Sequence, residues 1–166
     1  MPHSVLVSQL MIKPNEWPLL PADMDVETAL KILRIVTEDK KLLHGHSTPF
    51  VMNAQYKLVG FVHLIDLLSQ IRPLCSGSNC PDKVPRPTTL VSEITIPFAG
   101  TVRPADSILK ALDIMIEHRV SLAPVIEEDR LEGIIKLSDI FNTVASILFD
   151  AEIIDQKEIL MRRFSL

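Results

Sequence analysis

The sequence predicts an α+β protein made of two copies of one unit, each a small three-stranded sheet flanked by helices. One observation is a repeated nonapeptide, Leu-Val-Gly-Phe-Val-His-Leu-Ile-Asp at 58–66 and Leu-Glu-Gly-Ile-Ile-Lys-Leu-Ser-Asp at 131–139. Another is the tripeptide Pro-Ala-Asp, which occurs at 21–23 and again at 104–106. Because both elements recur in the same order, we expect two tandem repeats that pack with pseudo-twofold symmetry.

Each half begins with a lead-in that shares a pattern of aliphatic and polar residues, at 5–11 and at 90–95. A proline-containing stretch follows in both, and proline biases the residue before it toward extended backbone. Between the halves, residues 73–89 are rich in proline, which is typical of a linker. The predicted boundaries are therefore 1–72 for the first repeat, 73–89 for the linker and 90–166 for the second repeat.

After each Pro-Ala-Asp tripeptide, apolar residues recur at helical spacing, over 26–36 in the first half and 108–116 in the second. Asp25 and Asp106 are the expected N-caps, because a short carboxylate side chain accepts hydrogen bonds from the free N–H groups of a first helical turn. The first half carries seven additional residues before its next strand, with a charged run at 38–41. A longer first helix and turn are therefore expected there.

The next element in each half is a strand that contains a proline, at 48–52 and at 123–126. A short polar turn connects it to the strand of the repeated nonapeptide, so the two strands form a hairpin. A final helix is expected to start near the aspartate that ends each nonapeptide. In the second half the apolar period continues far enough for this helix to run to about Arg163.

The composition limits the classes of partner. The net charge of −4 argues against nucleic acid, whose phosphates require a basic face. There is no basic region followed by a long apolar run at the N-terminus and no stretch of about 18 apolar residues, so a cytoplasmic protein without a membrane partner is expected. Two cysteines, Cys75 and Cys80, are too few for a disulfide framework. Free thiols, a redox-responsive pair and metal ligation stay open for them.

Four elements occur twice in the same order: the lead-in, the tripeptide, the proline-containing strand and the glycine-containing nonapeptide. Together they resemble a tandem pair of CBS domains, a Bateman module. CBS pairs commonly bind AMP, ADP, ATP or S-adenosylmethionine in clefts between the two repeats. The resemblance therefore implies a module that binds an adenine nucleotide or adenosyl ligand and requires no cofactor. It also implies a homodimer that forms through the helices.

The resemblance assigns roles to residues of the nonapeptides. In the family, a Ser or Thr three residues after the glycine often contacts phosphate, and the Asp three residues further on often accepts hydrogen bonds from the ribose hydroxyls. Asp66 and Asp139 occupy the ribose positions, whereas His63 and Lys136 replace the hydroxyl residues. Lys136 can hold phosphate as a point charge beside a helix N-terminus, but His63 can do so only as a neutral donor or when protonated. The second motif is therefore expected to be the better anion site.

Structural roles remain open for these residues. Either aspartate can stabilise a first helical turn whatever the function, Lys136 can be an exposed lysine with a packed apolar stem, and His63 can be a partly buried histidine. The resemblance places further candidates along the ligand cleft: His46, Thr95, Val102, Pro124 and Val125. For His46 the alternative is a surface loop, and for the others it is packing. Trp17, in the first lead-in, can stack on adenine or cover the hairpin.

The sequence thus predicts a stand-alone regulatory module in which a ligand that bridges the repeats shifts a conformational equilibrium. Its output would pass through self-association or an unknown effector protein. The alternative is a ligand-free module for dimerisation or partner docking, with degenerate clefts. The sequence contains no Gly-rich phosphate loop, nucleophile motif or complete set of metal-ligand spacings, so neither enzymatic activity nor metal binding is expected.

Overall fold

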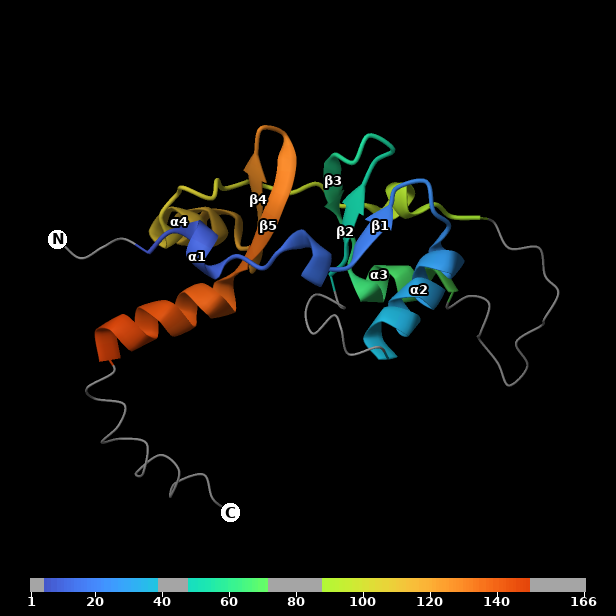
Figure 1. The fold of residues 1–166 in the computed structure, drawn as a ribbon. Helices are drawn as coiled ribbons and strands as arrows, with labels where there is room; N and C mark the ends of the chain where they lie inside the picture. The colour runs from blue at the N-terminus through green and yellow to red at the C-terminus, as the bar shows by residue number, and fades with distance from the viewer. Residues whose placement is uncertain (1–4, 39–47, 72–87, 150–166) are drawn as a thin grey trace, which may run out of the picture.

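The computed structural model of the chain describes residues 5–38, 48–71 and 88–149. Within these ranges the chain forms helices and two small sheets, which confirms the predicted α+β class. Figure 1 shows the two sheets next to each other in the middle of the molecule, with helices flanking both of them.

The first half forms the sheet β1-β2-β3, in which β1 (Leu19–Pro21) is parallel to β2 (Phe50–Met52) and β2 is antiparallel to β3 (Leu58–Phe61). Helix α2 (Val26–Glu38) precedes β2, and helix α3 (Leu64–Ile71) follows β3. The apolar faces of these elements enclose one core. Its buried members are Leu20, Val26, Ala29, Leu33, Val51, Val62, Leu67 and Val91.

The second half repeats this order. It contains α4 (Ile108–His118), the hairpin of β4 (Leu122–Glu127) and β5 (Arg130–Lys136), and a helix over 137–149. These elements enclose a second core of aliphatic side chains, as the helical and strand periods predict. Its buried members are Val7, Val102, Ile108, Ala111, Met115, Ala123, Val125, Ile135 and Ile140.

The third strand expected in the second half is reduced to a single bridge. Val102 pairs with Val125 in parallel orientation, where the first half has the strand β1. The N–H of Val102 donates to the carbonyl of Pro124 (3.1 Å), and its own carbonyl accepts from the N–H of Ile126 (2.8 Å). The same strand position is therefore filled in both halves, but the ladder is shorter in the second.

Both lead-ins start with a helical turn, α1 (Val7–Leu10) in the first and the 3₁₀ turn η3 (Val91–Ile94) in the second, and the 3₁₀ turn η1 (Pro14–Glu16) follows α1. The side chain of Val7 is fully buried in the core of the second half. The side chain of Val91 is fully buried in the core of the first half. Each lead-in therefore packs on the other half of the chain, and the two halves interlock.

Two backbone hydrogen bonds join each lead-in to a nonapeptide strand. Ile12 and Ile134 exchange N–H···O bonds of 2.8 and 2.9 Å, and Ile96 and Phe61 exchange bonds of 2.8 and 2.9 Å. These are equivalent positions of the two repeats. They make equivalent contacts, as pseudo-twofold symmetry requires.

The repeated glycine is explained by this close approach. A Cβ atom at Gly60 would overlap the carbonyl oxygen of Ile96, and one at Gly133 would lie 2.9 Å from the carbonyl oxygen of Ile12. Only a residue without a side chain lets the lead-in come so near the strand. The glycine of each nonapeptide therefore serves the packing of the repeats.

Of the N-caps predicted for α2 and α4, one is confirmed and one is wrong. Asp25 caps α2 as predicted, since its carboxylate accepts from the N–H of Thr28 (2.8 Å). The prediction for α4 is wrong, because its N-cap is Ser107, whose hydroxyl accepts from the N–H of Lys110. Asp106 lies one residue earlier, where its carboxylate accepts from the N–H of Arg103 (2.8 Å).

These contacts favour the charged form of both carboxylates. Hydrogen bonds from Thr28 lower the pKa of Asp25, and a hydrogen bond from the ammonium of Lys110 is the main cause of the lowered pKa of Asp106. Both groups thus stabilise their helices most strongly at neutral pH, where the carboxylates are ionised.

Some predicted features lie outside the described residues. They are nearly all of the linker, the additional residues at 39–47 and the continuation of the last helix beyond 149 toward Arg163. The described part of α2 has 13 residues against 11 in α4, in line with the longer first helix expected. No helix within the described ranges is long and apolar enough to cross a membrane.

Candidate functional site

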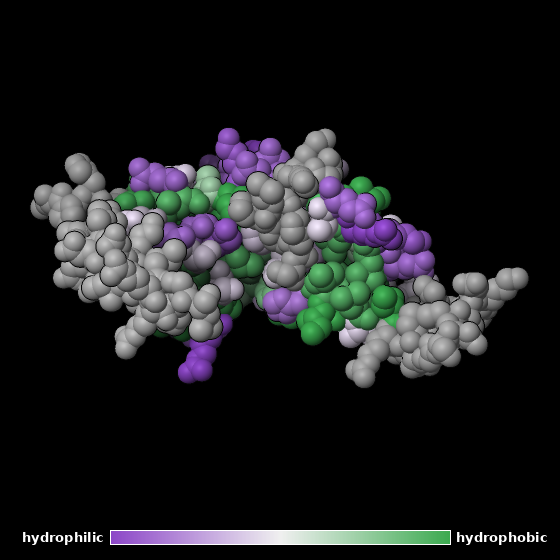
Figure 2. All heavy atoms as spheres, turned by 90° about the horizontal axis from the view of Figure 1, so that it is seen from below, coloured by the Kyte–Doolittle hydropathy of each residue, from purple (hydrophilic) through white to green (hydrophobic). Residues whose placement is uncertain are grey.

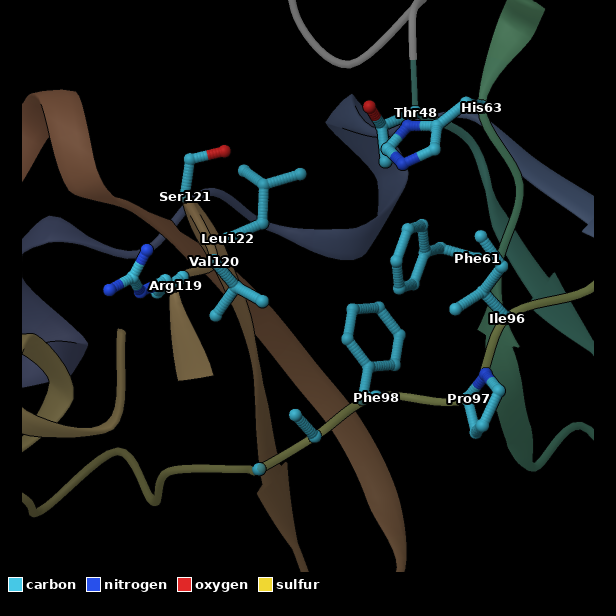
Figure 3. Close-up of a pocket in the computed structure, with 12 residues that line it drawn as sticks. Thr48, Phe61, His63, Ile96, Pro97, Phe98, Arg119, Val120, Ser121 and Leu122 are labelled. Carbon is cyan, nitrogen blue, oxygen red and sulfur yellow. The ribbon is translucent and has the colours of Figure 1, made fainter. Parts of the chain in front are cut away.

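A cavity of about 300 Å³ lies at the junction of the two halves, beside the first nonapeptide (Figure 3). Four segments line it: Thr48 before β2, Phe61 and His63 at the end of β3, residues 96–100 after the second lead-in turn, and residues 119–122 between α4 and β4. Because these segments come from both halves, a ligand bound here would contact both halves at once.

The floor of the cavity is aromatic. The ring centroids of Phe61 and Phe98 are 5.0 Å apart, and Phe98 packs edge-on against Phe50 at 4.6 Å. Behind them Trp17 is only 3% exposed, packs on Phe50 and donates its indole N–H to the carbonyl of Thr48 (3.1 Å). Trp17 therefore has a packing role here. The aromatic surface open to a ligand belongs to Phe61 and Phe98 and is suited to stack on a heteroaromatic base.

Polar side chains stand on two opposite sides of this floor. Figure 3 shows His63 and Thr48 on one side and Arg119 and Ser121 on the other. Among the described residues that line the cavity, none carries a carboxylate. The exposed side chain of Arg119 points away from the two rings in Figure 3. Exposed side chains change rotamer within nanoseconds, so its guanidinium is free to turn over a bound anion.

Arg119 ends helix α4 in the left-handed conformation, with φ 53° and ψ 44°. Its N–H and that of Val120 turn back to the carbonyls of Ile116 (3.3 Å) and Met115 (3.0 Å). Glycine is the usual residue at such a helix end, and another residue costs on the order of 1 kcal/mol. This strained turn brings residues 119–122 to the cavity.

The other side of the cavity is formed by the start of α3. The N–H groups of Asp66 (2.9 Å) and Leu67 (3.2 Å) both donate to the carbonyl of His63, which places His63 directly before the helix. The N–H groups of Leu64 and Ile65 donate to no other described residue. A helix N-terminus with free N–H groups favours an anion. Asp66 lies in this first turn but does not line the cavity itself.

The equivalent residues of the second half are arranged differently. The ammonium of Lys136 lies 3.5 Å from the carboxylate of Asp139, and both side chains are partly buried. Neither residue lines the cavity beside His63. In the first half, the segment that corresponds to the cavity-lining turn at 119–122 falls within the additional residues. These residues, His46 among them, lie outside the described part of the chain.

The remaining described site residues that the sequence predicts lie outside the cavity lining. The hydroxyl of Thr95 donates to a carbonyl of its own turn (2.8 Å). Val102 and Val125 are buried in the second core, and Pro124 is buried in strand β4, where it pairs with Ile134. None of these four predicted residues lines the cavity.

A metal centre is not formed by the part of the chain that the structure covers. No group of three or more His, Cys, Asp or Glu side chains comes together there. His63 lines the cavity and Asp66 follows it in the first turn of α3, and two ligands fall short of the four of a structural zinc site or the three of a catalytic one.

A family model for the CBS domain matches residues 7–73 and 91–146. The chain belongs to the CBS domain family. The two matched segments correspond to the two repeats, which confirms the predicted tandem CBS pair. No curated protein sequence matches the chain significantly.

Solved structures share this CBS fold. The cytosolic domain of the Mg²⁺ channel MgtE, in complex with ATP, is 25% identical with a TM-score of 0.64, over 84% of this chain and 48% of that chain. The chain thus spans about half the length of that MgtE domain. CBSX2, in complex with AMP, is 20% identical with a TM-score of 0.61, over 86% and 98%. CBS domains of a transcriptional regulator from Streptococcus pneumoniae are 19% identical with a TM-score of 0.59, over 83% and 98%.

Most residues that line the cavity between the CBS repeats are not among the site residues predicted from the sequence. Of the predicted site residues only His63 lines it, whereas Phe98, Arg119 and Ser121 were not predicted. One sequence signal for Arg119 exists, because an arginine stands at the end of an amphipathic helix where glycine is usual. Phe98 gives no such signal, since a phenylalanine between extended residues is equally suited to a core.

Proposed function

We propose that this CBS pair is a regulatory module that binds an adenine nucleotide or a related adenosyl ligand in the cavity beside the first nonapeptide. The composition of the cavity carries the proposal: two aromatic rings, a histidine before a helix N-terminus and an arginine, contributed by both repeats. The candidate ligands are AMP, ADP, ATP and S-adenosylmethionine. In this proposal the module catalyses no reaction and works in the cytoplasm.

The chemistry of the cavity suits the parts of such a ligand. The base would stack on Phe61 or Phe98. The phosphate would meet His63 and the free N–H groups at the start of α3, with the guanidinium of Arg119 closing from the opposite side. Asp66, in the first turn of α3, would accept hydrogen bonds from the ribose hydroxyls, as the family resemblance implies.

Two of the similar structures support an adenine nucleotide as the ligand class. The MgtE cytosolic domain was solved in complex with ATP, and CBSX2 in complex with AMP. The aromatic floor and the absence of carboxylates from the described cavity lining favour the same class on physical grounds.

The proposed mechanism is a population shift between two orientations of the repeats. A ligand that contacts Phe61 from the first repeat and residues 119–122 from the second favours the orientation in which both sets are within reach. The shift cannot exceed the difference in the ligand's affinity for the two states, which is about 1.4 kcal/mol for each factor of ten. The output would pass to an effector protein or through self-association.

We also propose the second motif as a weaker site, which reverses the order expected from the sequence. Lys136 and Asp139 are 3.5 Å apart and partly satisfy each other's charge. A phosphate would have to compete with this ion pair for Lys136. His63 has no such ionic partner among the described residues, and it opens on the cavity.

The second candidate function is a ligand-free module for dimerisation or partner docking. Large apolar side chains are exposed on the helices, among them Ile65 (73%) and Leu68 on α3 and Ile116 on α4. In Figure 2, which shows the molecule from below, apolar side chains gather over the α2 and α3 region. Contiguous exposed apolar surface is typical of an interaction site. A homodimer through these helices fits both candidate functions.

Thermal unfolding in the presence of AMP, ADP, ATP or S-adenosylmethionine separates the two candidates. A ligand that binds only the folded state raises its stability, by about 2.7 kcal/mol at 100 times its Kd. If none of the four raises the melting temperature at millimolar concentration, the sensor proposal fails. Light scattering on the same samples shows whether the module is a homodimer, and whether a ligand changes that state.

A further inference from the structure

We infer that the cavity beside His63 takes a nucleoside monophosphate in preference to the di- and triphosphate. This inference rests on the proposed function, because it presupposes that an adenine nucleotide binds in this cavity. It goes further by stating how many phosphate groups the preferred ligand carries. It assigns the preference for one phosphate to Arg119.

The number of charged groups around the cavity supports one phosphate. Among the described residues that line it, Arg119 is the one permanent cation, and His63 is the one further nitrogen donor on a side chain. Thr48 and Ser121 add hydroxyl groups. The nearest helix turn contributes the carboxylate of Asp66, which repels phosphate. The chain as a whole carries a net charge of −4.

A single phosphate matches this set of donors. A phosphate monoester carries roughly −1.5 to −2 charges at neutral pH, and a guanidinium can bind two of its oxygens at once. The second and third phosphates of ATP would find no further cation in the described lining and would add negative charge near Asp66. Within the described lining, their addition therefore brings repulsion without a new partner.

The backbone of Arg119 points to a role for its side chain. The residue sits in the left-handed conformation at the end of α4, where glycine would be less strained. Its guanidinium forms no ion pair with another described residue. No ion pair within the described part of the chain therefore offsets the strain, and the guanidinium lies exposed at the rim of the cavity.

Calorimetric titration of the full chain with adenosine, AMP, ADP and ATP, with and without Mg²⁺, tests the phosphate count. We expect AMP to bind about tenfold more tightly than adenosine and than ATP in both buffers. ATP binding as tightly as AMP in either buffer overturns the inference and leaves the proposed function intact. Binding by none of the four overturns the inference, and the proposed function fails with it if S-adenosylmethionine does not bind either.

Variants of Arg119 test the residue itself. Arg119→Gln should lower AMP affinity about tenfold and leave adenosine affinity unchanged, and Arg119→Lys should restore part of the AMP preference. Arg34→Gln is the matched control, because Arg34 is an exposed arginine on α2 that does not line the cavity. Melting temperatures of the unliganded variants report their folding. An unchanged ratio of AMP to adenosine affinity in folded Arg119→Gln contradicts the inference.

Discussion

The two nonapeptides, 58–66 and 131–139, occupy the same place in their repeats but face different surroundings. In both, a glycine lets the opposite lead-in approach, and the residue after that glycine exchanges two backbone hydrogen bonds with it. At the third position after the glycine they diverge. His63 opens on a cavity with an aromatic floor, whereas Lys136 lies beside Asp139.

Within each nonapeptide, the residues that pack the repeats together are therefore different from those that could bind a ligand. The glycine is fully accounted for by the junction between the repeats, so its recurrence says nothing about a ligand. The ligand-binding potential depends on what faces each motif. For the first motif that is 96–100 and 119–122, both from the second half of the chain.

Substitution of the two repeated glycines should have the largest effect on stability. Gly60→Ala should destabilise the protein by about 3 kcal/mol or more, because its Cβ would overlap the rigid backbone at Ile96. Gly133→Ala should cost about 1–2 kcal/mol, since one of its nearest neighbours is the flexible side chain of Met11 (2.8 Å). Urea unfolding measures both. Equal losses would show that the two junctions are equally rigid.

The interlocking of the halves can be tested at the two buried valines. Val7→Ala and Val91→Ala should each lower stability by about 2 kcal/mol through lost burial and a residual cavity. Hydrogen exchange should show the larger loss of protection in α4 for Val7→Ala and in α2 for Val91→Ala. Val59→Ala, at a 42% exposed position, is the control and should change little. Loss of protection confined to the lead-in's own half would contradict the packing of each lead-in on the opposite half.

Substitution of the aspartate in each nonapeptide tests which of the two motifs binds the ligand. Asp66→Ala should weaken AMP binding about tenfold, the value of one charge-assisted hydrogen bond to ribose. Asp139→Ala should change this affinity less than about threefold, because the carboxylate lies beside Lys136 and outside the cavity. Calorimetry on both variants compares them directly. The opposite ranking would restore the second motif as the main site.

The two helix starts give the smallest expected effect, and it depends on pH. The pKa values of Asp25 and Asp106 are lowered in the folded state, so their contributions are present above the unfolded value and are lost as pH falls through the folded pKa. Asp106→Asn should lower stability by less than about 1 kcal/mol at pH 7, since Lys110 is largely exposed.

Urea unfolding at pH 7 and near pH 2 measures this dependence. The difference between the wild type and Asp106→Asn should shrink as the pH falls through the lowered pKa of the Asp106 carboxyl, because the charge of the wild type is then lost. The Asp25→Asn variant should follow the same direction, since hydrogen bonds from Thr28 favour its ionised form. A difference that persists at low pH would assign the effect of either residue to its shape and not to its charge.

The repeated elements and the family were predictable from local patterns in the sequence. Helical and strand periods are local, because burial alternates along each element in a fixed way, so the order helix, strand, strand, helix in both halves was predictable. The helical turns α1 and η3 of the lead-ins were not predicted, and the third strand of the second half is only a bridge. Asp25 as a cap was predictable for the same reason. The cap of α4 was not, because one residue fewer separates the second Pro-Ala-Asp from its helix, which moves Ser107 into the capping position.

Tertiary structure alone decided which core each lead-in fills and where the cavity lies. Val7 and Val91 stand in nearly the same local sequence, and two similar aliphatic cores could accept either of them. The cavity draws on four segments that are distant along the chain, so neither Phe98 nor Arg119 is marked by its own neighbours as a partner of His63. Local patterns determine elements, whereas a site between repeats depends on which segments the packing brings together.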